Sequence, residues 1–321
     1  MSNNVEPEAT AGAHVAATTA PAKKAAPVKS INLHVGEIVP GVSKVDPIIV
    51  VDNVTRTFGG LTAVNVDHLE IPRNAITALI GPNGAGKTTL FNLLTGFDKP
   101  NSGTWTFAGS ALAGIPAYKV AKMGQIRTFQ LTKSLNLLTV LDNMKLGAKD
   151  QAGESFLRAL FPFFWKAEEA VIEDKAMELL ARFKLETKRD EYAASLSGGQ
   201  RKLLEMARAL MSDPTLVMLD EPMAGVNPAL TQSLLDHILD LKTQGMTVLF
   251  VEHDMQMVRH IADWVIVMAE GQVVAEGPPD TVMQNPAVID AYLGSHHDSD
   301  LGDPTEHVSA IKELLNDDDQ S

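Results

Sequence analysis

A glycine-rich run that ends in a lysine and two threonines occupies residues 81–89. It reads Gly81-Pro82-Asn83-Gly84-Ala85-Gly86-Lys87-Thr88-Thr89 and matches the pattern G-x-x-x-x-G-K-[ST]. The glycines let successive N–H groups face phosphate oxygens, and a helix that starts at Lys87 adds the positive end of its dipole. Lys87 is placed to reach the β- and γ-phosphates of a nucleotide, and the Thr88 hydroxyl to ligate Mg²⁺. The alternative is a turn without a ligand, but the run follows a strand-like segment and precedes a helical one. It therefore predicts a phosphate site.

Two acids end a second apolar run. Asp220 and Glu221 follow the four apolar residues Leu216–Leu219. Ligands bind α/β sheets at the carboxyl ends of the strands, so Asp220 is placed to hold Mg²⁺ directly or through water. Glu221 is placed to orient and deprotonate an attacking water. Such an acidic strand end is by itself more often a solvated turn. Beside a phosphate loop it predicts a nucleotidase.

A third motif combines a helix cap with two glycines. It reads Leu196-Ser197-Gly198-Gly199-Gln200. Ser197 is a good N-cap, the glycines allow close backbone approach, and Arg201–Met211 has helical apolar spacing. Taken alone, the motif would be a flexible loop that leads into a helix.

The elements that must position these residues alternate between strand-like and helical runs. The strand-like runs are Ile48–Val51, Val64–Ile71, Ala75–Ile80, Trp105–Ala108, Leu216–Leu219 and Val248–Val251, followed by a hairpin of Val265–Met268 and Val273–Ala275. Helical spacing covers Leu90–Leu94, and residues 133–200 read as a helical insertion with an aromatic patch at Phe156–Trp165. This alternation predicts an α/β core.

Composition limits the classes of function. The chain has 321 residues, of which 45% are apolar, so it can bury a core. Its net charge of −13 argues against nucleic-acid binding, and its lack of cysteine excludes disulfides and thiolate metal sites. There is no apolar run long enough to span a bilayer and no signal peptide, so we expect a cytoplasmic protein that meets a membrane only through partners.

The two ends of the chain differ from the middle. Residues 1–47 are rich in Ala, Pro, Thr and Lys, and residues 295–321 hold eight acids against the single Lys312. Neither segment can bury enough apolar surface to offset its ordering entropy. We predict a disordered N-terminal arm, an acidic C-terminal tail and a folded domain at residues 48–294, with hydrolysis independent of both ends.

The three motifs together resemble those of the ABC ATPases, and the resemblance runs from about residue 48 to residue 294. It implies a P-loop NTPase core of the α/β class with an antiparallel β subdomain and a helical insertion. It also implies a site shared by two chains, in which one subunit binds ATP and Mg²⁺. Ser197, Gly198, Gly199 and Gln200 of the other subunit then face the γ-phosphate.

Three further residues fit the family's pattern. Gln130, in Arg127-Thr128-Phe129-Gln130, resembles the glutamine that approaches Mg²⁺ and water, and His253 resembles the histidine that contacts the γ-phosphate. Phe58 resembles the aromatic residue that stacks on adenine, although a core Phe is the other interpretation. One residue departs from the pattern: Asn227 stands where many relatives carry Asp, which puts charge-based coupling through that loop in doubt.

Finer details are similar to one branch, the importers of branched-chain amino acids. The run Arg127–Gln130, the segment Ala224–Pro228, the insertion and the ending Ala291–Gly294 carry this resemblance. It implies a second ATPase subunit, identical or paralogous, permease subunits at the inner face of the cell membrane, and indirectly a solute-binding protein. Importers of urea or amides and other ABC transport systems remain alternatives. A non-transport ABC protein or a binding-only module fits less well, because the chain has one cassette and an intact set of chemical groups.

Overall fold

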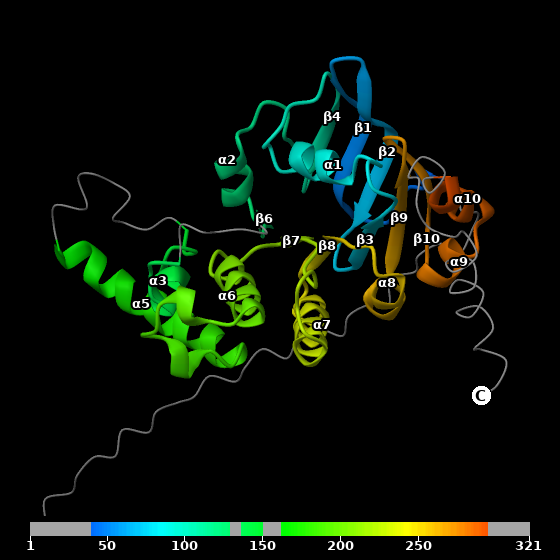
Figure 1. Cartoon of the computed structure of the whole chain (residues 1–321). Helices are drawn as coiled ribbons and strands as arrows, with labels where there is room; N and C mark the ends of the chain where they lie inside the picture. The colour runs from blue at the N-terminus through cyan, green and yellow to red at the C-terminus, as the bar shows by residue number, and fades with distance from the viewer. Residues whose placement is uncertain (1–39, 129–135, 150–161, 295–321) are drawn as a thin grey trace, which may run out of the picture. The chain divides into compact units, whose positions relative to one another are not determined.

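The computed structural model describes residues 40–128, 136–149 and 162–294 (Figure 1). An antiparallel sheet comes first in the chain. Its strands follow the order β2-β1-β4-β5 and are β1 (Pro47–Phe58), β2 (Leu61–Pro72), β4 (Ser102–Phe107) and β5 (Ser110–Ala111). Phe58 pairs with Leu61, so a two-residue Gly-Gly turn closes the first hairpin.

A six-stranded sheet carries the chemical motifs. Its order is β10-β9-β3-β8-β7-β6, built from β3 (Ile76–Ile80), β6 (Gln125–Arg127), β7 (Leu216–Asp220), β8 (Thr247–Val251), β9 (Trp264–Ala269) and β10 (Gln272–Gly277). Only β10 runs antiparallel to its neighbour. Parallel strands are buried on both faces, which explains the uninterrupted apolar runs at β3, β7 and β8. Their carboxyl ends meet at one edge of the sheet.

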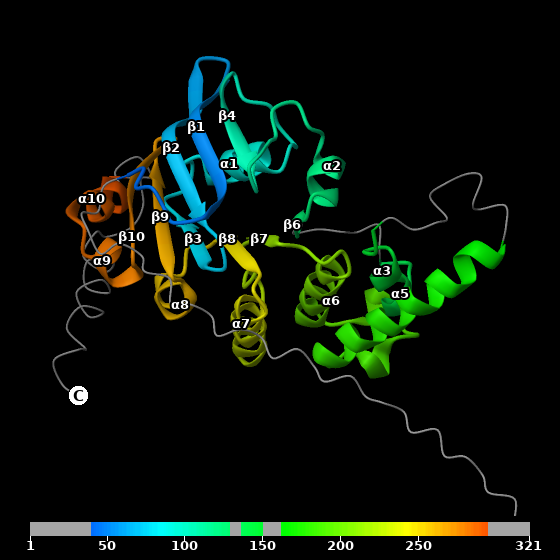
Figure 2. The same ribbon diagram turned by 180° about the vertical axis from the view of Figure 1, so that it is seen from behind.

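Helices flank this sheet on both sides. They are α1 (Lys87–Leu94), α2 (Ala117–Lys122), α3 (Val140–Lys145), α5 (Pro162–Arg182), α6 (Gly198–Leu210), α7 (Pro228–Thr243), α8 (Met255–Ile261), α9 (Pro279–Met283) and α10 (Pro286–Gly294). Both views place α1 on the side of β1 and β4, and α7 and α8 on the opposite side (Figure 1, Figure 2). None of the described helices combines the length and the hydrophobicity that a bilayer crossing requires.

The core consists of two clusters separated by the six-stranded sheet. Strand β3 serves both, because successive side chains of a strand point to opposite faces. Its residue Ala78 packs with helices α6, α7 and α8, whereas Leu79 packs with α1 and the antiparallel sheet. The phosphate loop therefore leaves a strand that is fixed from both sides.

The predicted fold class is confirmed: this is an α/β core with an antiparallel β subdomain and helices in the predicted insertion. Every predicted strand exists, but β1 is longer than the apolar run Ile48–Val51. Its second half is mostly polar, with Val54 as its one buried residue, so the apolar run could not show where the strand ends. Residues 1–39 and 295–321 lie outside the described residues, as does most of the aromatic patch, so both predicted ends and the domain bounds stay predictions.

Candidate nucleotide-binding site

The glycine-rich run forms the turn between β3 and α1. Gly86 is the N-cap of α1 and has φ of 96°, a left-handed conformation that favours glycine. A Cβ atom on Gly86 would lie 2.2 Å from the carbonyl oxygen of Ala63, so no other residue fits there. The loop thus directs the first amides of α1 toward one point, which is the arrangement that binds phosphate.

Lys87 brings the loop and the two acids together. Its ammonium donates to the carbonyl oxygens of Gly81 at 2.7 Å and of Pro82 at 2.9 Å. Burial lowers the pKa of Lys87, and the Glu221 and Asp220 carboxylates oppose that shift. Asp220 and Glu221 therefore act on the Lys87 ammonium, although they follow it by 133 and 134 residues in the sequence.

Asp220 ends β7 and forms an ion pair that the sequence analysis missed. Its Oδ2 lies 2.7 Å from Nη2 of Arg127, at the end of the neighbouring strand β6. The other guanidinium arm donates to the Asn92 side chain in α1 at 2.6 Å. Arg127 therefore connects the acid to the helix that begins at the phosphate loop, and Asp220 cannot rotate freely.

Glu221 has an unusual backbone. Its φ is 45°, in the left-handed region, which costs a non-glycine residue about 1–3 kcal/mol and occurs most often at functional sites. The Glu221 N–H donates to the carbonyl oxygen of Val251 at 3.0 Å, and its own carbonyl oxygen accepts from Nζ of Lys202 at 3.0 Å. The main chain is therefore held from both sides.

His253 follows β8 and is exposed, with 71% of its side chain accessible. Its neighbour Glu252 is only 2% exposed and was not recognised from the sequence. One Glu252 oxygen accepts the N–H of Met223 at 3.1 Å and the other accepts the N–H of His253 at 3.2 Å. Burial raises the pKa of Glu252, although those two N–H groups counteract the shift. Glu252 ties the loop after Glu221 to the segment that carries His253.

The motif at residues 196–200 forms the start of α6, as predicted. Ser197 is the N-cap: its hydroxyl accepts the N–H of Gln200, while the Gln200 side chain accepts the N–H of Ser197. This capping box fixes the helix start, where Ser197 and Gly198 are exposed. Within the described part of the chain, no hydrogen bond joins Ser197 or Gln200 to the phosphate loop.

Phe58 lies at the end of β1 with 48% of its surface exposed, so the interpretation as a core Phe is wrong. The guanidinium of Arg56 stands 4.4 Å from the centre of its ring. An exposed ring beside the antiparallel sheet is available as a stacking platform. Gln130, the remaining predicted residue, lies outside the described residues.

Known proteins resemble the chain over almost all of this structure. The family described as "ABC transporter" matches residues 64–224, a span that includes the phosphate loop, Ser197–Gln200 and Asp220. The branched-chain amino acid transport ATP-binding protein LivG of Escherichia coli is 39% identical, over 77% of this chain and 98% of its own length. BraF of Pseudomonas aeruginosa, named as a high-affinity protein of the same kind, is 40% identical with the same coverage. The chain belongs to the ABC transporter family.

As a member of that family, the chain is the ATP-binding and ATP-hydrolysing subunit of a transporter, and its fold is that of an ABC cassette. A solved cassette in its ADP conformation matches with a TM-score of 0.67 at 34% identity, covering 78% of this chain and all of that one. A dimeric bacterial cassette matches with a TM-score of 0.59 at 26% identity, covering 72% of this chain and 98% of that one.

The C-terminal part of the cassette matches a second family description, "Branched-chain amino acid ATP-binding cassette transporter", over residues 272–298. This part includes α10, where Tyr292 packs against the core beside the Gly81 backbone. Burial raises the pKa of the Tyr292 phenol. The C-terminal helix therefore contacts the first residue of the phosphate loop, a contact that the sequence motif gave no means to foresee.

The departure at Asn227 has a structural explanation. Asn227 is the N-cap of α7, and its side-chain oxygen accepts the N–H of Leu230 at 2.9 Å. Asn and Asp cap helices about equally well, so the substitution preserves the start of α7. The negative charge that an Asp would bring is nevertheless absent at position 227.

Proposed function

We propose that the chain hydrolyses ATP as one half of a cassette dimer that drives import of branched-chain or other hydrophobic amino acids. The observation that supports the hydrolytic site best is that the loop with Lys87 follows β3 and the two acids lie at the end of β7, at the same edge of one parallel sheet, where both carboxylates act on the Lys87 ammonium. The substrate class is supported by the names of the relatives and by the match at residues 272–298.

ATP binds with its adenine against Phe58 and its phosphates in the loop Gly81–Thr89. The loop amides and Lys87 stabilise the charge that spreads over the transferring phosphoryl group. Glu221 accepts the proton of the water that attacks the γ-phosphorus, and its fixed main chain aims the carboxylate. His253, exposed at the end of β8, contacts the γ-phosphate.

Mg²⁺ fits the oxygen groups that the site offers. The ion takes one or two side-chain oxygens together with phosphate oxygens. The Asp220 carboxylate is partly exposed and the Thr88 hydroxyl is exposed beside Lys87, so both are accessible. With Gln130 they would hold the ion, which neutralises phosphate charge when bound.

A second subunit completes the site. The start of α6 exposes Ser197 and Gly198, and no hydrogen bond among the described residues joins Ser197 or Gln200 to the phosphate loop of the same chain, so this helix start is available to the γ-phosphate of a partner's ATP. The partner cassette is identical or paralogous. Permease subunits hold the dimer at the inner face of the membrane, and a solute-binding protein delivers the substrate.

The test is to purify the chain from membranes in detergent, identify the proteins that accompany it, and reconstitute the complex in vesicles. We expect permease subunits to co-purify and ATP-dependent uptake of radiolabelled leucine or valine. Uptake of urea or acetamide in place of these amino acids would reassign the substrate, and recovery of ribosomal proteins alone would remove the transport function.

A further inference from the structure

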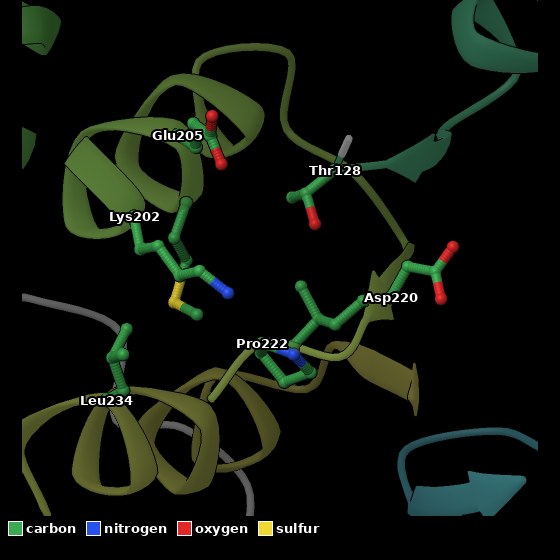
Figure 3. A pocket seen from close by; sticks show the side chains of 8 residues that line it. Thr128, Lys202, Glu205, Asp220, Pro222 and Leu234 are labelled. Atoms are coloured by element: carbon green, nitrogen blue, oxygen red, sulfur yellow. The ribbon is translucent and has the colours of Figure 1, made fainter. Parts of the chain in front are cut away.

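Lys202 connects two motifs that serve different steps of the reaction. It lies on α6, just after the capping box of Ser197 and Gln200, and its Nζ donates to the Glu221 carbonyl oxygen at 3.0 Å. Figure 3 shows its side chain reaching from α6 into a pocket, with Thr128 opposite and the Asp220 carboxylate directed away. This hydrogen bond therefore joins α6, which begins with Ser197–Gln200, to the end of β7, which is followed by Glu221.

The bond from Lys202 acts on a residue with an uncommon backbone conformation. Glu221 holds a left-handed backbone, with φ of 45°, that an ordinary residue seldom adopts. The Val251 carbonyl oxygen holds its N–H, and Lys202 holds its carbonyl oxygen. Because the two peptide groups that flank a Cα set the direction of its Cα–Cβ bond, these contacts aim the Glu221 side chain.

The Lys202 ammonium is partly buried beside three carboxylates, and the effect of burial on its pKa outweighs theirs. Burial lowers the pKa of Lys202, but the carboxylates of Glu205, Glu252 and Glu221 act in the opposite direction. They come from α6 itself and from the ends of β8 and β7. A charged donor forms a stronger hydrogen bond to a carbonyl oxygen than a neutral one does.

We propose that Lys202 is a positioning residue for hydrolysis. It holds the main chain of Glu221 in the left-handed conformation and so attaches the general base to α6, the helix whose first residues face the partner's nucleotide. The proposal depends on the role of Glu221 as the base.

The first experiment compares Lys202→Met, which keeps the length of the side chain but removes the donor, with Lys202→Arg. We expect Lys202→Met to lower kcat about 10- to 100-fold, the range for loss of a charged hydrogen bond, with KM and ATP affinity nearly unchanged. Lys202→Arg should restore most of kcat, since it retains a charged donor. Unchanged kcat in Lys202→Met, or an equal loss of ATP affinity, would overturn the proposal.

Lys175 supplies a matched control. Its Nζ also donates to a backbone carbonyl oxygen, that of Met211, at 2.9 Å, but Met211 lies at the C-terminal end of α6, and Lys175 pairs there with Asp213 at 2.6 Å. Lys175→Met should leave kcat within about twofold of the wild type, because this lysine bonds no residue of the strand ends that carry Asp220 and Glu221. A similar loss in both methionine variants would show a general structural effect and contradict the proposal.

A double-mutant cycle identifies the group through which Lys202 acts. If Lys202 works through the Glu221 carboxylate, Lys202→Met should add little loss to the residual single-turnover rate of Glu221→Gln. Multiplicative losses would mean another route and sink the proposal. Normal turnover of Glu221→Gln itself would instead remove the base from the proposed function. Normal turnover of Lys202→Met beside an inactive Glu221→Gln would refute the inference about Lys202 alone.

Discussion

Glu221 and Glu252 are both acids at strand ends, yet the structure gives them different tasks. Glu221 follows β7 near Lys87, whereas Glu252 is buried after β8 and accepts two backbone N–H groups. In the proposed function the first transfers a proton, whereas the second holds two loops together through its hydrogen bonds. Their residue type and spacing are alike, so only their surroundings separate the roles.

Glu221→Gln tests the proton-transfer role. The amide keeps the size of the side chain but cannot accept a proton from water, so turnover should fall roughly 10²- to 10⁴-fold. ATP affinity should not change, because Lys87 and the loop amides remain. The measurement is steady-state ATPase activity beside equilibrium nucleotide binding, and retained turnover would exclude Glu221 as the base.

Glu252 gives a prediction about pH. Its raised pKa means that the folded chain binds a proton more tightly than the unfolded chain does. The stabilisation that it contributes is therefore full below the ordinary glutamate pKa, about 4.3, and is lost as pH rises through the folded pKa.

The pH dependence is measured as the free energy of unfolding of the wild type minus that of Glu252→Gln, at a series of pH values. This difference should decrease with rising pH across the window. Glu178→Gln, at an exposed position on α5, is the control and should parallel the wild type. A difference that is constant with pH would contradict the assignment.

At the scale of elements, the N-terminal part of α6 carries two groups of the proposed site. Its N-terminus carries the exposed capping box, and its first turns carry Lys202, which bonds the strand end that bears Glu221. In the proposed dimer, this helix start meets the nucleotide of the second subunit.

The variant Ser197→Arg tests whether this helix start contacts the nucleotide of a second subunit. A bulky cation at the helix start should abolish hydrolysis and ATP-driven dimerisation while leaving ATP affinity intact, because the affinity rests on Lys87. Lys87→Ala should lose ATP binding itself. Activity of the wild type should rise with concentration, measured by ATPase assay beside light scattering. Hydrolysis that ignores both concentration and Ser197→Arg would contradict the two-chain site.

Mixing these two inactive variants provides a sharper form of the same test. If the partner cassette is identical, a mixed dimer contains one site with an intact loop and an intact Ser197, so part of the activity should return. Absence of recovery would favour a paralogous partner or obligate coupling between the two sites.

The sequence predicted the elements better than the contacts between them. Apolar runs identify buried strands, and Ser197 with Gln200 at a spacing of three predicts a capped helix. The contacts Arg127–Asp220, Lys202–Glu221 and Glu252–Met223 join elements that are distant along the chain. Periodicity tells which face of a strand is buried but not which residue lies across from it, so these partners were not predictable.

At the scale of the whole molecule, the segment before β1 is anchored to the last strand of the central sheet. Lys44 is buried and pairs with Glu276 in β10, while the N–H groups of Gly41 and Val42 donate to the same carboxylate at 2.7 and 2.9 Å. Trp264 in β9 also donates to Glu276, at 2.9 Å. Gly41, Val42 and Lys44 lie within residues 1–47, the segment that we predicted from composition to be a disordered arm.

Trimmed chains test this anchor. A chain of residues 40–294 should match the full chain in ATPase activity and thermal stability, whereas residues 48–294 should lose stability, because Glu276 then stays buried without its cation. Removing one partner of a buried ion pair costs about 3–5 kcal/mol. Lys44→Met in the full chain should show a comparable loss of unfolding free energy. Equal stability of the two trimmed chains would show that the anchor contributes nothing.

The Lys44–Glu276 pair also has a consequence for the order of events during synthesis. Glu276 is added to the chain 232 residues after Lys44, so until that point of translation the lysine lacks this carboxylate. Domains made on the ribosome generally fold as units. The anchor of the N-terminal segment can therefore close only once the β9–β10 hairpin has left the ribosome.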